Sequence, residues 1–355
     1  MPVFIAGELR RHGFEAIILS RSKKLLAFAK EQGVPSIRSW WWSRQNWSGM
    51  KALLFPIYVG WQVILFFYYV VIFIKLRPSI VHLQAKDDFI AGTFAARALG
   101  IRAFWSDYAD LKHIWLNHGV WYKNPIGKFV YLAAHLADTI VVVSREDKRL
   151  IAANIPNGAI KRKLKIIHNG FADIYKPAKK TTDFISTARL VTDKGIAELI
   201  EAFSWLVAEF PTATLAIVGD GPEKERFKNQ ARGIKGITFK GYQREPLPFL
   251  ARSKVFVLPT YHEGFSIALV EACMSGLAII ATDVGGNSEI IVDKKDGLLV
   301  PAKNVDALYE AMKKLYKNTG LQETLGAKAR EKFMKSYELS DVVEKKFLPL
   351  YEGRA

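Results

Sequence analysis

The sequence predicts an α/β fold built from two doubly wound parallel sheets, and three observations lead to that prediction. Short apolar strands alternate with helical segments in both halves of the 355 residues. Residues 258–282 run strand, turn, helix, strand, which is a βαβ unit. The polar stretch 176–182 (KPAKKTT) separates the halves like a linker. We therefore expect domains over 1–175 and 178–338, with a tail over 339–355 that packs back on the first domain.

The first half begins with a helix, expected over 1–13, before any strand. The strands that follow are expected at 15–20, 80–84, 102–105, 139–144 and 165–167. Helices are expected between them at 88–99, 126–136 and 146–153. Because strands separated by helices pair in parallel, the strands at 15–20 and 80–84 should share one sheet.

The second half repeats this alternation more regularly. Its strands are expected at 183–187, 213–218, 237–240, 254–258, 277–281 and 297–300. Its helices are expected at 195–209, 223–231, 246–251, 266–275, 304–317 and 321–337. In sheets of this kind, ligands bind where strand ends meet helix starts, so the turns after these strands are the first place to look for a site.

Composition narrows the classes of partner. There are 51 Lys and Arg against 34 Asp and Glu, a net charge of +17, which favours anionic membranes or phosphorylated substrates. Nucleic acid is not expected, because the basic residues are scattered and no binding motif is present. The single cysteine, Cys273, excludes an internal disulfide and is expected to be a small buried residue.

A long apolar run over 53–74 follows a cluster of four tryptophans in SWWWSRQNW at 39–47. The run is long enough to cross a membrane. A span would, however, put the strands at 15–20 and 80–84 on opposite sides of the bilayer. A helix that packs on the sheet and exposes an aromatic face to the membrane interface is the preferred alternative, ahead of complete burial and of a true span.

The turn at 259–266 gathers residues that suit ligand binding. Glu263 lies in the turn, and Glu271 lies about one turn inside the following helix. Gly264 lets a ligand approach the backbone closely. A helix start also offers free N–H groups to an anion, here those of Phe265, Ser266, Ile267 and Ala268. Carboxylates can lie beside such an anion site if they accept hydrogen bonds from hydroxyl groups while cations hold the phosphates.

Two further strand-to-helix turns carry polar residues. The turn STARLVTDKG (186–195) supplies the cations Arg189 and Lys194. The other turn contains Gly219 and Asp220, and a lone Gly-rich turn is more often ordinary turn chemistry than a phosphate site.

HEGFSIALVEA and ARLVTDKG resemble the donor-site motifs of retaining family 4 glycosyltransferases, which have the GT-B fold. Segments similar to other family motifs occur in the same order: VVVS, HNGFADIYKP, VGDGPE, VGGNSEII and DGLLVP. Each motif alone is weak, but their common order over roughly half of the chain is specific. The resemblance implies two Rossmann-like domains facing each other across a cleft.

The resemblance also implies roles for the candidate residues in transfer of a hexosyl group from a nucleotide-diphosphate sugar. Arg189 and Lys194 would hold the diphosphate and stabilise it as it leaves. Glu271 would accept from the ribose hydroxyls, and Glu263 from the transferred sugar. No cofactor besides this donor and no metal is expected, since the sequence has no Asp-x-Asp motif and no His/Cys cluster with ligand spacing.

The sequence departs from the family pattern in its first domain. The family begins with a strand and a Gly-Gly turn, and neither precedes the helix at 1–13. Either the start lies beyond them or the domain lacks them, and their loss would leave a gap in the sheet. A family histidine that touches the donor sugar corresponds here to Asp107, with Asp110 and His113 close behind. Asp107 would bond the sugar, accept the acceptor's proton or cap the next segment.

We expect the acceptor to be a lipid-linked or cell-envelope glycan, with the protein bound peripherally to the cytoplasmic face of an anionic membrane. Two alternatives stay open. The absent first strand favours a non-catalytic partner subunit, and paired carboxylates also occur in glycoside hydrolases.

Overall fold

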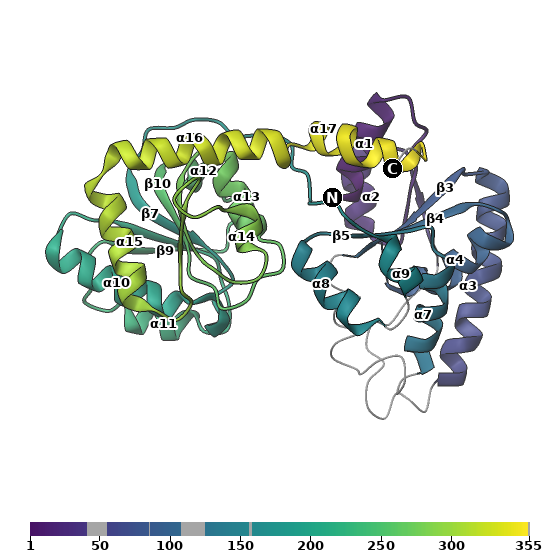
Figure 1. Cartoon of the computed structure of the whole chain (residues 1–355), viewed down its shortest axis with the longest axis horizontal. Helices are drawn as coiled ribbons and strands as arrows, with labels where there is room; N and C mark the ends of the chain where they lie inside the picture. The colour runs from purple at the N-terminus through teal and green to yellow at the C-terminus, as the bar shows by residue number, and fades with distance from the viewer. Residues whose placement is uncertain (41–54, 85, 108–124, 156–157, 354–355) are drawn as a thin grey trace. The chain divides into compact units, whose positions relative to one another are not determined.

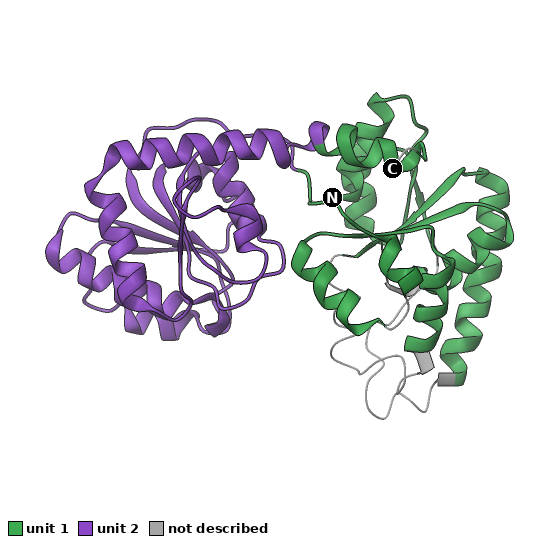
Figure 2. Ribbon diagram, viewed as in Figure 1, with its two compact units in different colours: residues 1–170, 342–355 green, residues 171–341 purple. Residues whose placement is uncertain are grey.

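The computed structural model of the protein describes residues 1–40, 55–84, 86–107, 125–155 and 158–353 (Figure 1). The chain divides into two compact units (Figure 2). Unit 1 comprises residues 1–170 and 342–355, and unit 2 comprises residues 171–341. The stretch 176–182, expected as the linker, therefore lies inside unit 2. Phe171 explains the earlier boundary, because its N–H and C=O bond to Tyr337 and Leu339 at 2.8 and 3.0 Å.

Unit 2 contains one parallel sheet of six strands in the order β12-β11-β10-β7-β8-β9. Its strands are β7 (Thr182–Thr187), β8 (Leu215–Val218), β9 (Ile237–Gly241), β10 (Ser253–Leu258), β11 (Ala278–Thr282) and β12 (Leu298–Val300). Its main helices are α10 (Ile196–Glu209), α11 (Lys224–Gln230), α12 (Leu247–Ala251), α13 (Ile267–Met274), α14 (Asn287–Ile290), α15 (Val305–Lys317) and α16 (Thr319–Ser336). The predicted strands and helices of this half are confirmed, with ends that differ by at most two residues.

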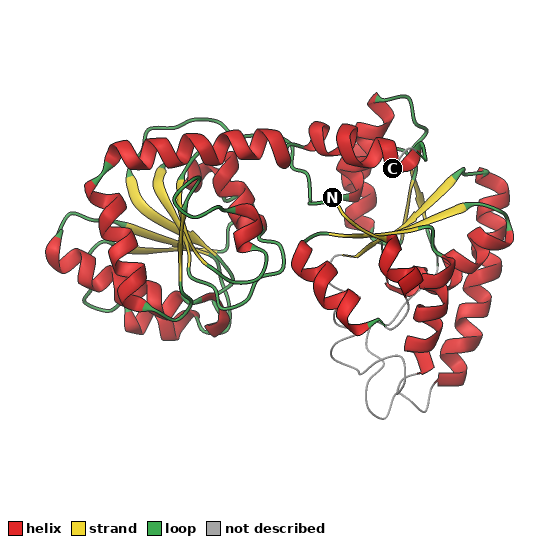
Figure 3. Cartoon of the chain, in the orientation of Figure 1, coloured by secondary structure: helices red, strands yellow, loops and turns green. Residues whose placement is uncertain are grey.

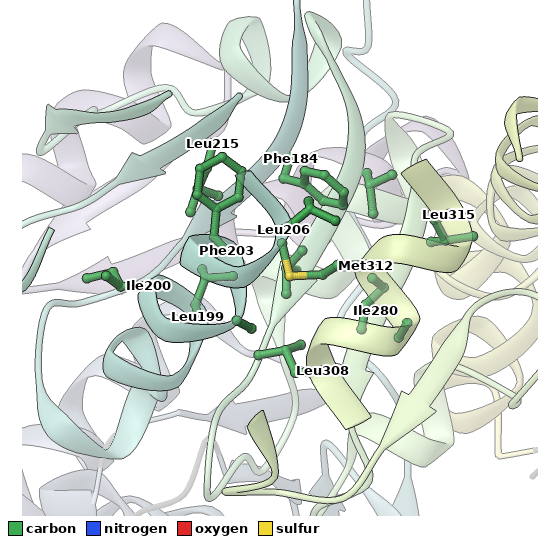
Figure 4. Close-up of a cluster of buried hydrophobic side chains, with 14 of the residues drawn as sticks. Phe184, Leu199, Ile200, Phe203, Leu206, Leu215, Ile280, Leu308, Met312 and Leu315 are labelled. Atoms are coloured by element: carbon green, nitrogen blue, oxygen red, sulfur yellow. The ribbon is translucent and has the colours of Figure 1, made fainter. Parts of the chain in front are cut away.

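Helices cover both faces of this sheet (Figure 3). Alternate strand residues point to opposite faces. On one face, Phe184, Leu215 and Ile280 pack against α10 and α15 through Phe203 and Met312 (Figure 4). The other face packs against α13 and α16, where Cys273 is buried as predicted. The strands are thus held rigidly from both sides, which fixes the turns at their carboxyl ends.

Unit 1 contains two separate parallel sheets. The first pairs β1 (Ile18–Ser20) with β2 (Ser36–Arg38), and the second has the order β3 (Ile80–Leu83), β4 (Arg102–Asp107), β5 (Thr139–Val142) and β6 (Leu164–Ile166). The prediction that the strands at 15–20 and 80–84 share one sheet is therefore wrong. The structure instead keeps β1 and β2 in a sheet of their own, apart from the sheet of β3 to β6. Accordingly β1 and most of β3 are half-buried, whereas β5 is buried throughout.

Two sets of helices flank the larger sheet of unit 1 (Figure 1). Helices α3 (Phe55–Leu76), α4 (Lys86–Ala98) and α7 (Pro125–Leu136) lie on one face. Helices α1 (Pro2–Arg11) and α2 (Lys23–Glu31) lie on the other side with the C-terminal segment, and α8 (Arg145–Asn154) and α9 (Gly158–Lys163) connect the last strands. The predicted helices are confirmed, whereas α2, β2 and α9 were not anticipated.

The C-terminal segment packs in unit 1 through aromatic side chains. It begins at the end of α17 (Leu339–Val342), whose first three residues belong to unit 2, and continues through the π-helical turn η3 (Val343–Phe347) and α18 (Leu348–Tyr351). The Tyr351 ring stacks on Phe104 of β4 with centroids 5.6 Å apart. The Tyr351 hydroxyl lies 2.5 Å from Nδ1 of the buried His82, whose Nε2 lies 2.8 Å from Ser106 Oγ. These contacts tie the end of the chain to β3 and β4.

Helix α3 has one buried and one exposed face, although both faces are apolar. Its inner face packs against α4: the Gln62 side-chain oxygen accepts from the Ala91 N–H at 3.2 Å, and the Tyr69 hydroxyl donates to Asp88 at 2.7 Å. Its outer face carries six side chains that are 49–64% exposed: Ile57, Val63, Ile64, Phe67, Val71 and Ile74. Complete burial of this run, one of the three alternatives, is therefore wrong. Most of the tryptophan cluster lies in 41–54, outside the described residues.

Candidate functional site

The candidate site of unit 2 lies at the carboxyl edge of its sheet. Four turns emerge there, after β7, β8, β10 and β11, and these strands are neighbours in the sheet. The turns span residues 188–195, 219–223, 259–266 and 283–286. Parallel strands present all their carboxyl ends at one edge, so residues far apart in the sequence are brought together here.

Main-chain contacts join the turn after β7 to the turn after β10. The Asp193 carbonyl accepts from the Tyr261 N–H at 2.8 Å and from the Thr260 hydroxyl at 3.0 Å. Gly195 lies against Pro259, where an added Cβ would be only 2.0 Å from the Pro259 carbonyl oxygen. Since Gly195 also has φ +66°, only glycine fits without strain. The two turns therefore form one continuous surface.

This junction brings together two of the predicted residues. Lys194 Nζ lies 2.8 Å from Glu263 Oε2, and both side chains are about one-fifth exposed, at 21% and 19%. The pair thus offers a cation and a carboxylate side by side, both within reach of a ligand from solvent. Such a pair can separate to bind an anionic group and a hydroxyl group at neighbouring positions of one ligand.

Glu271 is the fifth residue of α13, about one turn inside the helix, as predicted. Burial raises the pKa of its carboxyl group to about 7. Among the described residues, its carboxylate has no hydrogen-bond partner. The helix start in front of it is capped by Ser266, whose hydroxyl accepts from the Leu269 N–H at 3.3 Å. Ser266 is buried, whereas Ile267, the first helical residue, is 51% exposed.

The turn after β11 packs directly beneath Glu263 and Gly264. The Gly286 N–H donates to the Glu263 carbonyl at 3.0 Å. A Cβ on Gly286 would lie 1.8 Å from the Gly264 carbonyl oxygen. The VGGN segment therefore supports the turn of Glu263 rather than presenting side chains of its own.

The turn after β8 lies beside Arg189. Gly219 has φ +144°, and a Cβ on it would lie 1.8 Å from the Ala188 carbonyl oxygen. Asp220 pairs with Lys224 at 2.8 Å, and the hydrogen bonds from Lys224 and from the Gly221 N–H lower the pKa of its carboxyl group. The acidic side chain is thus engaged within its own turn. Arg189 is exposed, and its side chain forms no ion pair with another described residue.

Asp107 ends β4 and is buried in unit 1. It belongs to a different unit from the other candidates, so its role stays a prediction. Asp110 and His113, the suggested substitutes, lie outside the described residues.

Sequence reasoning missed a hydrogen bond between Tyr261 and Glu198. The Tyr261 hydroxyl donates to the Glu198 carboxylate, and Lys303 Nζ lies 4.7 Å from the centre of the Tyr261 ring. Glu198 lies four residues after Lys194, and Tyr261 two residues before Glu263. This closeness to Lys194 and Glu263 was the only indication in the sequence. It points to a contact only when the strand order, which makes β7 and β10 neighbours, is known.

Comparison with known families decides the identity. A profile described as Glycosyltransferase Family 4 matches residues 4–173, and one described as Glycosyl transferases group 1 matches residues 171–332. The two matches together cover nearly all of both units. The chain is a family 4-like glycosyltransferase of the GT-B fold. The predicted family and fold class are thereby confirmed.

Individual relatives agree with this assignment. An exopolysaccharide phosphotransferase from Streptomyces coelicolor is 30% identical over 216 residues, which are 59% of this chain and 23% of that protein. The UDP-Gal:alpha-D-GlcNAc-diphosphoundecaprenol alpha-1,3-galactosyltransferase of Escherichia coli is 24% identical over 298 residues, which are 76% of this chain and 74% of that protein. A glycosyltransferase structure from Rickettsia africae superposes with a TM-score of 0.77 and 17% identity, covering 99% and 93% of the two chains. The chain spans only 23–39% of the length of three of the first curated relatives.

Proposed function

We propose that this glycosyltransferase transfers a hexosyl group from a nucleotide-diphosphate sugar with retention of configuration. The observation that carries the proposal is the Lys194–Glu263 pair at 2.8 Å, at the same sheet edge as Glu271. A diphosphate needs cations, whereas a ribose and a sugar need hydrogen-bond acceptors, and these three side chains supply both.

Each side chain acts on a different part of the donor. On binding, Lys194 turns from Glu263 toward the diphosphate, and Arg189 joins it. Their charge counts most as the diphosphate leaves, because negative charge develops on it at that point. Glu263 is then available to the sugar hydroxyls and Glu271 to the ribose, while the N–H groups around Phe265 and Ser266 meet the phosphates.

The same cations make a divalent metal unnecessary for the proposed reaction. The charge on the leaving diphosphate is met by Lys194, Arg189 and the start of α13. Within the described parts of the chain, no group of three or more His, Cys, Asp or Glu is placed to hold a metal ion. We therefore propose transfer that is independent of added metal and of any cofactor besides the donor.

We propose a lipid-linked or cell-envelope glycan as the acceptor. The name of the Escherichia coli relative gives UDP-Gal as its donor and a diphosphoundecaprenol-linked sugar as its acceptor. An acceptor of that class is carried by a membrane, so an enzyme acting on it works at a membrane surface.

The distribution of charge supports a membrane partner. Unit 1 contains 27 Lys and Arg against 12 Asp and Glu, a net charge of +15, whereas unit 2 contains 24 against 22, a net charge of +2. Nearly all of the excess charge thus belongs to the unit that carries the exposed face of α3. Basic residues near an anionic bilayer contribute about 1 kcal/mol each to binding.

The side chains of α3 support a position in the plane of the membrane interface. The exposed stripe is apolar throughout, and beside it Trp40 lies 5.3 Å from the Tyr68 ring and 6.5 Å from the Trp61 ring, measured between centroids. Aromatic residues favour the headgroup level. In the described part of the chain, α3 is also the one helix long and apolar enough to span a membrane. Its inner face, however, is bonded to α4, so we propose peripheral binding at the cytoplasmic face.

Vesicle co-sedimentation tests the membrane proposal. The protein should sediment with vesicles containing phosphatidylglycerol, less so as salt is raised, and should be released by alkaline extraction. Replacing Phe67 and Val71 by Ser should abolish binding, whereas Ile174→Ser, at an equally exposed residue of unit 2, should leave it unchanged. Recovery in the supernatant with and without vesicles would contradict the proposal, and resistance to alkaline extraction would indicate a span.

Turnover of a nucleotide sugar tests the catalytic proposal. Lys194→Ala and Arg189→Ala should lower kcat more than they weaken donor binding, because the charges act mainly on the departing diphosphate. Lys313→Ala is the matched control, since it removes a Lys–Glu pair (Lys313–Glu209, 2.7 Å) elsewhere in unit 2. Normal turnover by both site variants would show that the site is wrongly assigned.

A non-catalytic partner subunit is the second candidate, favoured by the separate two-stranded sheet of unit 1. Donor binding without any turnover by the wild-type protein would support it. Glycoside hydrolysis is less favoured. Burial raises the pKa of Glu271 as a general acid requires, but the other carboxylate, Glu263, is paired with Lys194, a cation that suits a phosphate and that hydrolysis does not need.

A further inference from the structure

We propose that Tyr261, held by Glu198, is a positioning residue that sets the geometry of Lys194 and Glu263. The inference rests on the proposed glycosyl transfer and adds residues to its site. We do not assign the Tyr261 hydroxyl a contact with the nucleotide sugar, because it already forms a hydrogen bond to Glu198 on α10.

Three links join the turn of Lys194 to the turn of Glu263. The first is the main chain, where Asp193 accepts from Tyr261 and Thr260. The second is the Lys194–Glu263 ion pair. The third is the Tyr261–Glu198 hydrogen bond, which connects the start of α10 to the turn before α13.

The third link matters most when the second opens. If Lys194 turns to the diphosphate and Glu263 to the sugar, their ion pair no longer holds the two turns at a fixed distance. The Tyr261–Glu198 bond involves neither charge and persists. It therefore keeps the cation and the carboxylate at the spacing that the bound donor requires.

The surroundings of Tyr261 suit a permanent link. Burial, followed by the hydrogen bond to Glu198 and its charge, raises the pKa of the Tyr261 hydroxyl, so the group stays a donor throughout the neutral range. Lys303 covers the ring at 4.7 Å, a distance at which a cation is attracted to an aromatic face. The side chain is thus fixed at its hydroxyl and on one ring face.

The chain supplies a matched control for this link. Tyr309 also donates to a glutamate of α10, Glu209, at 2.7 Å, and a lysine, Lys313, lies 5.5 Å from its ring centre. That second pair lies at the far end of α10, away from the candidate site. Tyr261→Phe should lower kcat about 10- to 100-fold with little change in KM, whereas Tyr309→Phe should leave both unchanged.

A double-mutant cycle separates positioning from a general structural role. If Tyr261 acts through Lys194, Tyr261→Phe should cause little further loss in a Lys194→Ala background. Glu198→Ala should reproduce the loss, and Glu198→Gln, which keeps an acceptor oxygen, should restore most of the turnover. Wild-type kcat in Tyr261→Phe, or an undiminished loss in the Lys194→Ala background, would overturn the inference.

Hydrogen exchange tests the same link without a donor. Tyr261→Phe should accelerate amide exchange in peptides covering 188–195 and 259–266, and Tyr309→Phe should not. Unchanged exchange in Tyr261→Phe would overturn the inference even if the wild-type protein showed no transfer. Absence of transfer by the wild-type protein would instead contradict the proposed function.

Discussion

Glu271 couples stability to pH through its buried carboxyl group. The pKa of Glu271 is about 7 in the folded protein, against an ordinary value of 4.5 for a glutamate in the unfolded chain, so folding disfavours the ionised form. The contribution of Glu271 to the free energy of unfolding is therefore largest below pH 4.5. It falls by up to about 3 kcal/mol as the pH rises through 7. Glu271→Gln should raise the melting temperature above pH 7 while weakening donor binding. The exposed Glu323→Gln is the control, and an unchanged melting temperature in Glu271→Gln would contradict the expectation.

His82 couples the C-terminal segment to pH in the opposite direction. Burial lowers the pKa of this histidine to about 4 from an ordinary 6.5. Because the unfolded chain binds this proton more readily than the folded protein, the contribution of His82 to the free energy of unfolding falls by about 3 kcal/mol as the pH drops from about 6.5 to 4. His82→Gln should remove that part of the acid sensitivity, measured by denaturant unfolding across this range.

His168 provides the comparison for His82. Burial, and then the charges of Arg145 and Lys346, lower the pKa of His168 to about 4 as well. The His82 contribution is therefore read from the difference between the wild-type protein and His82→Gln, with His12→Gln as control. Equal acid sensitivity in all three proteins would contradict it.

The sequence identified candidate residues whose charged side chains lie in or just after a turn between a strand and a helix. Glu263, Lys194 and Glu271 stand at strand-to-helix junctions, where pattern alone predicts a ligand edge. The Tyr261–Glu198 bond was not predictable, because it joins two turns whose adjacency depends on strand order. Asp220 shows the converse: its turn was predicted, but only the structure shows its pairing with Lys224.

At the scale of elements, glycines determine how closely the turns of unit 2 approach. Gly195 and Gly241 have nearly equal φ, +66° and +68°, but only Gly195 has a backbone oxygen where a Cβ would lie. Gly241→Ala should therefore cost only the left-handed backbone term, about 1–2 kcal/mol.

Gly195→Ala should cost about 2–4 kcal/mol more than Gly241→Ala, because the turn must move away from Pro259. It should also weaken the donor site, since Lys194 is the adjacent residue. Thermal unfolding and donor titration of the two variants test this. Equal destabilisation by both substitutions would mean that the contact with Pro259 is not structurally important.

Helix α3 shows where sequence patterns stop being informative. Its extent was predicted closely, 53–74 against Phe55–Leu76. Its orientation was not, because both faces are apolar and give no periodic contrast. Contacts to α4 identify the inner face. The short elements α2 and β2 were missed. The pairing of β1 was predicted wrongly because the apolar pattern of a strand does not show which strand lies beside it.

At the scale of the molecule, the alternation of apolar strands with helical segments predicted the order and type of most elements in both halves. The position of the junction between the units was not predicted, because the polar composition of 176–182 resembles a linker. In the structure, Phe171 is hydrogen-bonded to the backbone of Tyr337 and Leu339, and unit 1 therefore ends at residue 170. The concentration of charge in unit 1 was present in the sequence but became visible only with the division into units.

The most direct test of the central claim is calorimetric titration of the whole protein with UDP-, GDP- and ADP-sugars. We expect one class of nucleotide sugar to bind to the wild-type protein. Glu271→Ala should weaken that binding by about 1.5–3 kcal/mol, which corresponds to the loss of charged hydrogen bonds. Tyr309→Phe should bind like the wild type. Failure of every nucleotide sugar to bind, or equal binding by Glu271→Ala, would contradict the assignment of this sheet edge as the donor site.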